Sequence, residues 1–349
     1  MGILFSADWD GDLELYAVGG DGSEVTQLTD NDVDDYSASW SSDGARLAYI
    51  SDSFDPRLHL MNADGSGRRL IAEDLVPARG TVAWSPLGDT IAFRYIRDLY
   101  AVQVESGDTT LLVRDDDLFP DAPVFSPDGS RIAFIADVEG SAWIRLYTVN
   151  ADGTGLAELD FEDGDVYFLS WHPELEQIVF SAYQPAKGPL IYTIDPDGEL
   201  TVVSRPGASG RPLWAPDGSV VGYFERILGL DEDGEPNIDK DFLLIATADG
   251  GVELAVLKPP DEPLVGLALS DFVWAPDSRH LAYTTPTAAD DSETVDLHVL
   301  DVCSGASKLV AEGIDKDSTP SWTAERISFV VQSPTEQPAA EQPTTEQPA

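Results

Sequence analysis

Short apolar runs alternate with tight-turn signals along most of the chain. The stretch from Phe125 to Leu159 shows the pattern most clearly (FSPDGSRIAFIADVEGSAWIRLYTVNADGTGLAEL). Ser-Pro-Asp-Gly and Ala-Asp-Gly are turn sequences, because proline presets φ and glycine tolerates a positive φ. Between the turns, Ile132 to Ala136, Ile144 to Val149 and Leu156 to Leu159 have the composition of strands. The stretch therefore predicts a four-stranded antiparallel sheet, apolar on both sides, that needs similar sheets as neighbours.

The same unit recurs along the chain. An aromatic anchor followed by a turn and an apolar strand occurs at Trp40, Trp84, Phe125, Trp171, Trp214, Trp274 and Trp322. A second hairpin recurs in step, as in LHLMNADGSGRRLIA and LYTVNADGTGLAEL. A period of roughly 40 to 50 residues with four strands is typical of a β-propeller blade. The pattern thus predicts an all-β propeller rather than an ordinary β-sandwich with uneven strands.

Counting the repeats indicates how the ring closes. Six anchors begin complete sets of four strands, whereas the N-terminus has no first strand and the C-terminus supplies one at Trp322. Joining the two ends completes a seventh blade and removes exposed sheet edges. One second strand is then in excess, either Ile3 to Ser6 or Ile327 to Val331. Seven blades are expected, with six or eight as the alternatives.

The repeats resemble a known family. Trp-Ser-Pro-Asp-Gly followed by an Ile-Ala-Phe-like strand, an Ile-Tyr-like strand and an Asp-Ala-Asp-Gly turn is similar to the TolB-type propeller repeat. Phe5 to Thr29 (FSADWDGDLELYAVGGDGSEVTQLT), continued by DDYSASWSSDG, matches best, and the resemblance covers nearly all of the chain except its last residues. It implies the fold strongly and the function weakly, because such propellers have many activities.

The composition changes near the C-terminus. Residues 1–331 read as the propeller, whereas residues 332–349 are rich in Pro, Glu, Gln and Thr and have no large apolar side chain. Such a segment cannot bury enough surface to offset its ordering entropy, so a disordered tail or linker is expected. The sequence shows no signal peptide and no membrane span. The localisation stays unknown, although the resemblance implies a periplasmic or extracellular protein of the cell envelope.

The chain is strongly acidic, with 64 Asp and Glu residues against 20 Lys and Arg and a net charge of −44. This charge would repel nucleic acids and anionic membranes. Three explanations remain for it: adaptation to high salt, cation sites, or a surface for a basic partner.

The acidic residues are expected on two different faces of the ring. First-to-second and third-to-fourth turns share one face, here called the turn face, where Asp and Gly are explained by turn geometry. Second-to-third loops and blade-to-blade connections share the other, the loop face, and their sequences vary, as functional loops do. Asp35, Asp121 and Asp317 precede anchors and are expected at the rim of the central channel on this face. They are predicted binding residues, with capping of the inner strand as the alternative.

Two loops have oxygen ligands at alternate positions, as calcium sites do. One contains Asp8, Asp10 and Asp12, and the other contains Asp231, Asp233 and Asp239. Neither fits the helix-flanked calcium loop, because the glycine comes at the fourth position instead of the sixth and the closing glutamate at the twelfth position is missing. The sequence therefore leaves two expectations, either no cofactor or calcium. For each loop, the alternative to a calcium site is an ordinary solvated turn.

Catalytic motifs are mostly missing from the sequence. It contains no Gly-x-Ser-x-Gly elbow and no Gly-rich phosphate loop before a helix. The four histidines fall in different blades, and His59 and His298 occupy equivalent positions, which favours packing roles over a ligand cluster. Cys303 ends a third strand and is interpreted as a small core or turn residue.

These observations favour a non-catalytic, monomeric module whose acidic loop face binds a protein or peptide with basic segments. Two alternatives stay open: a metal-dependent lyase or hydrolase with its site in the channel, and a structural blade array from a larger surface protein. The chain is therefore more simply explained as a binding protein than as an enzyme, with no nucleic-acid or membrane-inserted partner.

Overall fold

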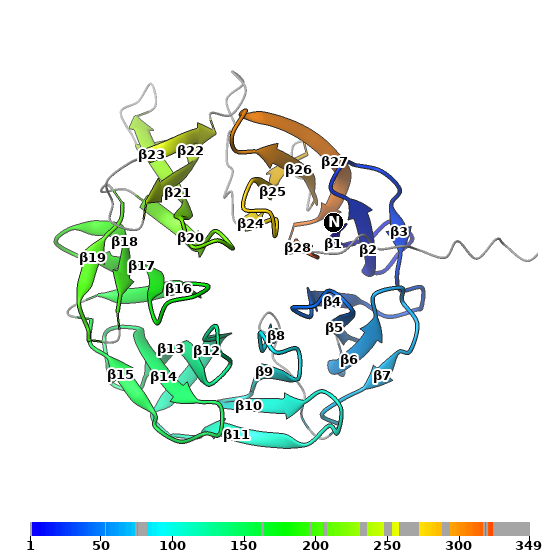
Figure 1. Ribbon diagram of the computed structural model, residues 1–349, viewed down its shortest axis with the longest axis horizontal. Coiled ribbons are helices and arrows are strands. Elements are labelled where there is room, and N and C mark those ends of the chain that lie inside the picture. Colours follow the sequence, from blue (N-terminus) through cyan, green and yellow to red (C-terminus); the bar gives the residue numbers. More distant parts are fainter. Residues whose placement is uncertain are drawn as a thin grey trace, which may run out of the picture.

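The protein is a ring of seven four-stranded antiparallel sheets, as the repeats predicted (Figure 1). The computed structural model describes residues 2–52, 54–73, 75, 82–161, 164–195, 197–204, 208–230, 236–247, 253–257, 272–287, 294–316, 318 and 320–323. Secondary structure in this part of the chain is entirely strand, in 28 segments.

Six blades are each formed by four consecutive strands. Blade 1 comprises β4 (Asp35–Trp40), β5 (Arg46–Ser51), β6 (Arg57–Asn62) and β7 (Arg69–Leu70), and blade 2 comprises β8 (Val82–Trp84), β9 (Thr90–Tyr95), β10 (Asp98–Gln103) and β11 (Thr109–Val113). Blade 3 comprises β12 (Leu118–Phe125), β13 (Arg131–Val138), β14 (Arg145–Asn150) and β15 (Ala157–Leu159), and blade 4 comprises β16 (Asp165–Trp171), β17 (Ile178–Gln184), β18 (Gly188–Ile194) and β19 (Leu200–Val202). Blade 5 comprises β20 (Ala208–Trp214), β21 (Val220–Leu230), β22 (Pro236–Thr247) and β23 (Glu253–Leu257), and blade 6 comprises β24 (Phe272–Trp274), β25 (His280–Pro286), β26 (Thr294–Asp301) and β27 (Ala306–Asp315).

The seventh blade, here called the closing blade, joins the two ends of the chain. Its strands are β28 (Ser321–Trp322), β1 (Gly2–Ala7), β2 (Glu14–Gly19) and β3 (Thr26–Gln27), in that order. β1 pairs with β2 along its whole length and with β28 through two residue pairs, Ile3 with Trp322 and Leu4 with Ser321. The predicted closure by both termini is therefore confirmed, and Ile3 to Ser6 lies in the second strand of the blade. Ile327 to Val331 and the predicted tail lie outside the described residues.

The hydrophobic core is divided among the interfaces between blades. Seven clusters of buried side chains occur in the described residues, and each joins one blade to the next around the ring. For example, Phe134 and Tyr147 of blade 3 pack with Leu99 of blade 2, whereas Ala133 and Leu146 of blade 3 pack toward blade 4. Burying both sides of every sheet explains why the strands read as nearly continuous apolar runs.

Three of the aromatic anchors link neighbouring inner strands by hydrogen bonds, whereas the indole nitrogens of Trp40, Trp214 and Trp322 are buried without a hydrogen-bond partner. The indole Nε1 atoms of Trp84, Trp171 and Trp274 donate hydrogen bonds of 3.1, 3.1 and 3.2 Å to the carbonyl oxygens of Ser39, Val124 and Leu213. In each pair the acceptor belongs to the inner strand of the preceding blade. Because tryptophan has both a large apolar ring and one donor, it suits a position that is buried yet adjoins a backbone carbonyl.

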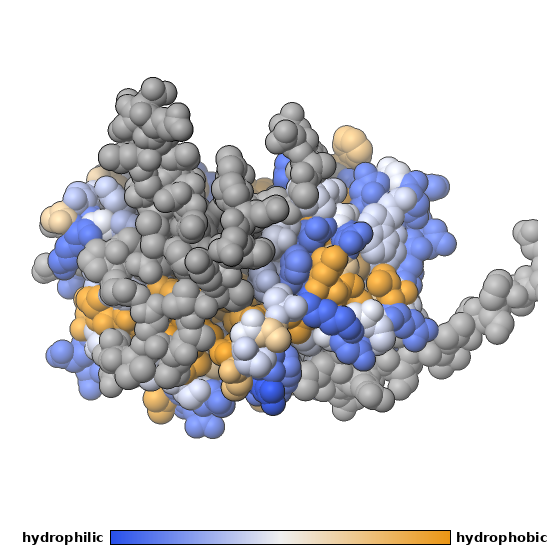
Figure 2. Space-filling view, turned by 90° about the horizontal axis from the view of Figure 1, so that it is seen from above, coloured by the Kyte–Doolittle hydropathy of each residue, from blue (hydrophilic) through white to orange (hydrophobic). Residues whose placement is uncertain are grey.

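The side view shows how polar and apolar residues divide (Figure 2). Hydrophobic residues form an orange band around the middle of the ring, with hydrophilic residues above and below it. Function should therefore be sought on the two polar faces, and the described part of the loop face has the more varied sequence.

Candidate functional site

The connection between β1 and β2 lies on the loop face and carries the first predicted acidic loop. Asp8 Oδ1 accepts a hydrogen bond of 3.0 Å from Gly11 N, which closes a tight turn. Gly11 has a φ of 124°, a conformation that L-residues with a side chain rarely adopt. Asp8 and Asp10 are exposed, and Asp12 is partly buried with its Oδ2 atom lacking a hydrogen-bond partner.

Trp9 is the aromatic residue of this loop, and it is fixed in place. Its ring lies 4.4 Å from that of Tyr16 and 5.7 Å from that of Phe5, measured between centroids. Its Nε1 donates a 3.1 Å hydrogen bond to the Gly313 carbonyl in β27 of blade 6. Nevertheless 46% of Trp9 is exposed to solvent. Trp9 was not among the residues predicted from the sequence, although an aromatic residue in an otherwise polar loop was a signal that could have identified it.

Behind the loop lies a buried carboxylate network. Glu14 at the start of β2 is 0% exposed, and its Oε1 accepts a 2.6 Å hydrogen bond from Asn31 N. Asn31 Nδ2 in turn donates a 2.8 Å bond to Asp35 Oδ2, and Asp35 is 1% exposed. Glu14 Oε2 and Asp35 Oδ1 are buried without a hydrogen-bond partner. The network fixes the connection between β3 and β4 against the first acidic loop.

Burial and mutual repulsion weaken the acidity of this group. The pKa of Asp12 is raised by burial and by the charges of Asp10, Asp34, Asp32 and Asp8. Burial raises the pKa of Glu14, although hydrogen bonds from Thr29 and Asn31 offset part of the effect. Burial likewise raises the pKa of Asp35, against hydrogen bonds from Ser51, Asn31 and Thr29. The loop face near the closing blade therefore has more negative charge than its surroundings compensate.

The three predicted rim residues differ in their exposure and in whether the structure describes them. Asp35 lies at the start of inner strand β4, as expected, but its enclosed carboxylate fits the capping alternative better than direct contact with a ligand. Asp121 lies in inner strand β12, where Oδ2 is 3.2 Å from Arg94 Nη1 and Oδ1 accepts a bond from Ala122 N. Asp121 is partly exposed. Asp317 lies outside the described residues, and a binding role for all three stays a prediction.

The predicted calcium ligands do not form a ligand set as they are placed. In the described part of the chain, no three His, Cys, Asp or Glu side chains are positioned to hold one metal ion, and this includes Asp8, Asp10 and Asp12. In the second loop, Asp231 and Asp233 lie outside the described residues. Asp239 is described only as backbone within β22. Calcium binding at either loop stays a prediction.

The histidines have separate structural partners. His172 Nδ1 accepts hydrogen bonds from Glu174 N and Leu175 N, at 3.1 and 3.0 Å. His280 Nδ1 lies 2.7 Å from Asp277 Oδ2, and His298 Nε2 lies 2.9 Å from Thr285 Oγ1. The ring of His59 lies 5.4 Å from that of Tyr49, measured between centroids, in a tilted arrangement. These separate partners agree with the predicted packing roles. Cys303, in contrast, is exposed, so its interpretation as a core residue is wrong and the turn position holds.

On the turn face, the acidic residues have a purely local role. Asp43, Asp64, Asp128 and Asp152 each accept a backbone hydrogen bond from the residue two positions on. Serine or threonine hydroxyls add further hydrogen bonds, so the pKa of each of these carboxyls is lowered. For Asp128, bonds from Ser130 N and from the Ser126 and Ser130 hydroxyls lower the pKa to about 2. Turn geometry accounts for them, as the sequence predicted.

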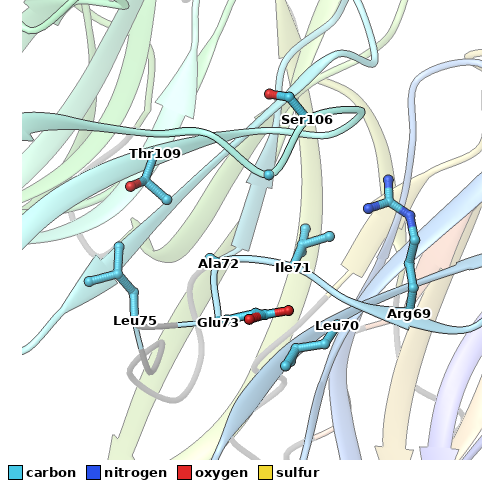
Figure 3. Close-up of a pocket in the computed structure, with 9 residues that line it drawn as sticks. Arg69, Leu70, Ile71, Ala72, Glu73, Leu75, Ser106 and Thr109 are labelled. Atoms are coloured by element: carbon cyan, nitrogen blue, oxygen red, sulfur yellow. The ribbon is translucent and has the colours of Figure 1, made fainter.

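A cavity of about 420 Å³ lies at the outer edge between blades 1 and 2 (Figure 3). Arg69, Ile71 and Glu73 line it from the end of β7 and the residues after it, and Ser106 and Thr109 line it from blade 2. Arg69 Nη2 donates a hydrogen bond to the Val104 carbonyl, which ties the two blades together. The cavity is remote in the sequence from the acidic loops, and its lining contains no His or Cys. The described residues of the lining thus combine polar side chains, such as Arg69 and Glu73, with apolar ones.

No helix in the described residues has the length and hydropathy of a membrane-spanning helix.

Comparison with known proteins agrees with this architecture. The chain is 29% identical over 157 residues to "Protein TolB homolog" of Chlorobium luteolum, a match that covers 44% of this chain and 35% of that protein. It is 23% identical over 334 residues to "Dipeptidyl-peptidase 5" of Porphyromonas gingivalis, covering 86% of this chain and 44% of that protein. The chain therefore matches less than half the length of either relative.

Among solved structures, an oligogalacturonate lyase in complex with manganese superposes with a TM-score of 0.67 at 18% identity, covering 86% of both chains. At this identity the likeness concerns the fold. Residues 2–173 match the family described as "TolB beta propeller domain". The resemblance to the TolB-type β-propeller repeat that was inferred from the Trp-Ser-Pro-Asp-Gly repeats is thus confirmed.

Proposed function

We propose that the protein is a non-catalytic binding module whose acidic loop face takes a protein or peptide segment rich in basic residues. The ring supplies a rigid support, and the loop between β1 and β2 together with the connection between β3 and β4 supplies the contacts. The family resemblance is compatible with this function but does not select it, because the similar proteins include a TolB homologue, a peptidase and a lyase.

One observation carries the proposal, namely that acidic residues from two segments of the chain lie close enough to Asp12 to raise its pKa, in addition to the effect of burial. The charged groups that raise its pKa are all acidic, and they come from two separate segments, 8–10 and 32–34. On the turn face, by contrast, each carboxylate has its own local donors. A concentration of like charge on rigid loops attracts cationic partners and is relieved when they bind.

The other roles follow from the same arrangement. The Glu14–Asn31–Asp35 network would hold the loops in place, and Asp121 would offer a rim carboxylate shared with Arg94. The Pro- and Gln-rich segment 332–349 would tether the ring to another component. We further propose a monomer working in the cell envelope, as the family resemblance implies.

The test compares two variants that lose the same charge from opposite faces. Asp8→Asn/Asp10→Asn removes two carboxylates from the loop face, and Asp64→Asn/Asp152→Asn removes two from the turn face. The probe is a fluorescent Gly-spaced arginine peptide, with its citrulline analogue as the neutral control, titrated by anisotropy at low and at physiological salt. We expect the loop-face variant to weaken binding about two- to tenfold, because exposed ion pairs each contribute little.

Equal effects of the two variants would mean that the net charge attracts the peptide without a preferred face, and would contradict the proposal. Binding of the citrulline peptide as tightly as the arginine peptide would contradict it as well. The enzyme alternative would gain support if a divalent metal at micromolar concentration raised the unfolding temperature, because a specific site stabilises in proportion to ln(1 + [L]/Kd).

A further inference from the structure

Trp9 combines fixation with exposure, which is unusual for so large an apolar residue on a polar face. The indole is held by Gly313 O through Nε1 and rests on the ring of Tyr16. Yet 46% of the residue stays open to solvent. A role in linking the closing blade to blade 6 explains the hydrogen bond of the indole and its contact with Tyr16. It does not account for the exposed part.

Acidic residues flank Trp9 in the sequence. Asp8 and Asp10 are its sequence neighbours and are themselves exposed, and Asp12 lies in the same loop. Asp8 is bonded to Gly11 N, and Asp10 Oδ2 receives only a long 3.4 Å bond from Gln27 Nε2. The loop therefore carries an exposed aromatic residue at a fixed place together with exposed carboxylates. Cations bind over the faces of aromatic rings, tryptophan best of all, and exposed tryptophan is a frequent hot spot of interfaces.

A second exposed aromatic residue on the loop face shows what is special about Trp9. Phe54, in the corresponding loop of blade 1, is 100% exposed, and Asp52 and Asp55 flank it. There, however, Asp55 already forms a 2.8 Å ion pair with Arg57. The acid beside Phe54 thus has a cation of its own, whereas the charges around Asp12 repel one another.

We propose that Trp9 and the carboxylates of Asp8 and Asp10 form a subsite for one arginine side chain of the partner. This inference rests on the proposed function and names the place where the basic segment is anchored. The guanidinium would stack on the exposed part of the indole while its N–H groups donate to the carboxylates. Arginine fits better than lysine, because its planar, weakly hydrated group can stack and form paired hydrogen bonds at the same time.

The experiment uses the full chain and three peptides that differ only in the basic residue: arginine, lysine or citrulline. Trp9→Leu is compared with Phe54→Leu, which removes an exposed aromatic ring from the equivalent loop of the neighbouring blade. We expect Trp9→Leu to weaken binding of the arginine peptide about two- to fivefold, the contribution of an exposed cation–π contact, and Phe54→Leu to leave it unchanged. The wild type should prefer arginine to lysine.

Because Trp9 also staples two blades, its replacement could disturb the loop. Asp10→Asn provides a second variant, since Asp10 is exposed and makes only the long contact with Gln27. Because the charge of Asp10 is one of those that raise the pKa of Asp12, the unfolding temperature of Asp10→Asn should be equal to or above that of the wild type while binding weakens. In the ¹⁵N spectrum, the indole Nε1–H signal that Trp9→Phe removes should shift when the arginine peptide is added.

The outcomes separate the two proposals. If the wild type binds the arginine peptide but Trp9→Leu and Asp10→Asn bind it equally well, the subsite is wrong and the binding function stands. If the wild type does not bind the arginine peptide even at low salt, the binding function itself fails. Equal losses in Trp9→Leu and Phe54→Leu would show a diffuse aromatic surface and overturn the assignment to Trp9.

Discussion

Carboxylates on the two faces of the ring have opposite environments. On the turn face, Asp43, Asp64, Asp128 and Asp152 accept hydrogen bonds from backbone and hydroxyl donors, which lower their pKa values. On the loop face, burial and neighbouring acids raise the pKa values of Asp12, Glu14 and Asp35. The same residue type therefore stabilises the fold on one face and strains it on the other.

This difference shows that a net charge of −44 says little by itself about function. The turn-face acids are accounted for by the backbone that they cap. The ionised loop-face acids lower the stability of the fold, because burial and neighbouring acids make their charged form unfavourable. Groups with such perturbed pKa values are common at binding sites, which makes this face a candidate. The comparison thus assigns the functional face from local contacts rather than from composition.

The largest effect that tests the comparison is expected from pH, because pH acts on both groups of carboxylates at once. As the pH falls from 7, the loop-face groups with raised pKa values take up protons more readily in the folded than in the unfolded protein, so stability should rise. Below about pH 4 the turn-face acids have the opposite effect. Their pKa values are lower in the folded than in the unfolded protein, so the unfolded protein takes up more protons and the free energy of unfolding should fall toward pH 2.

Denaturant unfolding at constant ionic strength measures this profile, and the midpoint should pass through a maximum in mildly acidic solution. A steady loss of stability from pH 7 downward would contradict the repulsion assigned to the loop face.

A smaller effect is expected from one turn. Ser126 is 0% exposed, and its hydroxyl donates to Asp128 Oδ1 at 2.7 Å and accepts from Arg131 N at 2.9 Å. Ser126→Ala leaves the Arg131 amide without this acceptor and should reduce the free energy of unfolding by about 1–2 kcal/mol. Ser130→Ala, at an exposed position of the same turn, is the control and should change it by less than about 0.5 kcal/mol. Equal losses would mean that the hydroxyl inside the turn has no special role.

The smallest effect is expected at a single loop-face acid. Glu14→Gln keeps an acceptor for Asn31 N but removes the buried negative charge. At pH 7 the variant should unfold at a higher denaturant concentration than the wild type, because the raised pKa of Glu14 makes its ionised form costly. The difference should shrink as the pH falls and disappear near pH 3, well below the ordinary pKa of glutamate, where Glu14 is protonated in both folded and unfolded wild-type protein. A variant less stable than the wild type at pH 7 would show that the ionised carboxylate is favourable there.

Much of the fold could be predicted, because every blade repeats the same local signals. The strand expected over Ile132 to Ala136 is part of β13, and the turns fall at the Pro-Asp-Gly and Ala-Asp-Gly sequences. What the pattern could not decide was which terminal segment enters the closing blade. Ile3 to Ser6 and Ile327 to Val331 have similar apolar patterns, and the place of β1 depends on its pairing with β2 and with residues more than 300 positions away.

The candidate site was less predictable, because its properties depend on such distant contacts. The spacing placed Asp35 correctly at the start of an inner strand, but its burial depends on the loop that Glu14 and Asn31 hold over it. Trp9 read as one residue of a polar loop, and its fixed position depends on Gly313 in another blade.

The fastening between β28 and β1 has a mechanical consequence. Trp322 lies opposite Ile3, and Thr323 N donates a hydrogen bond to Gly2 O, so the first residues of β1 and the last residues of β28 lie at the same end of their pairing. A pulling force applied at Gly2 and Thr323 would therefore break the hydrogen bonds between β1 and β28 one after another. It would not load all of them at the same time, as a shearing force does. The pairing between β28 and β1 should therefore separate at low force. The ring would then open at the closing blade while the other six blades stay folded.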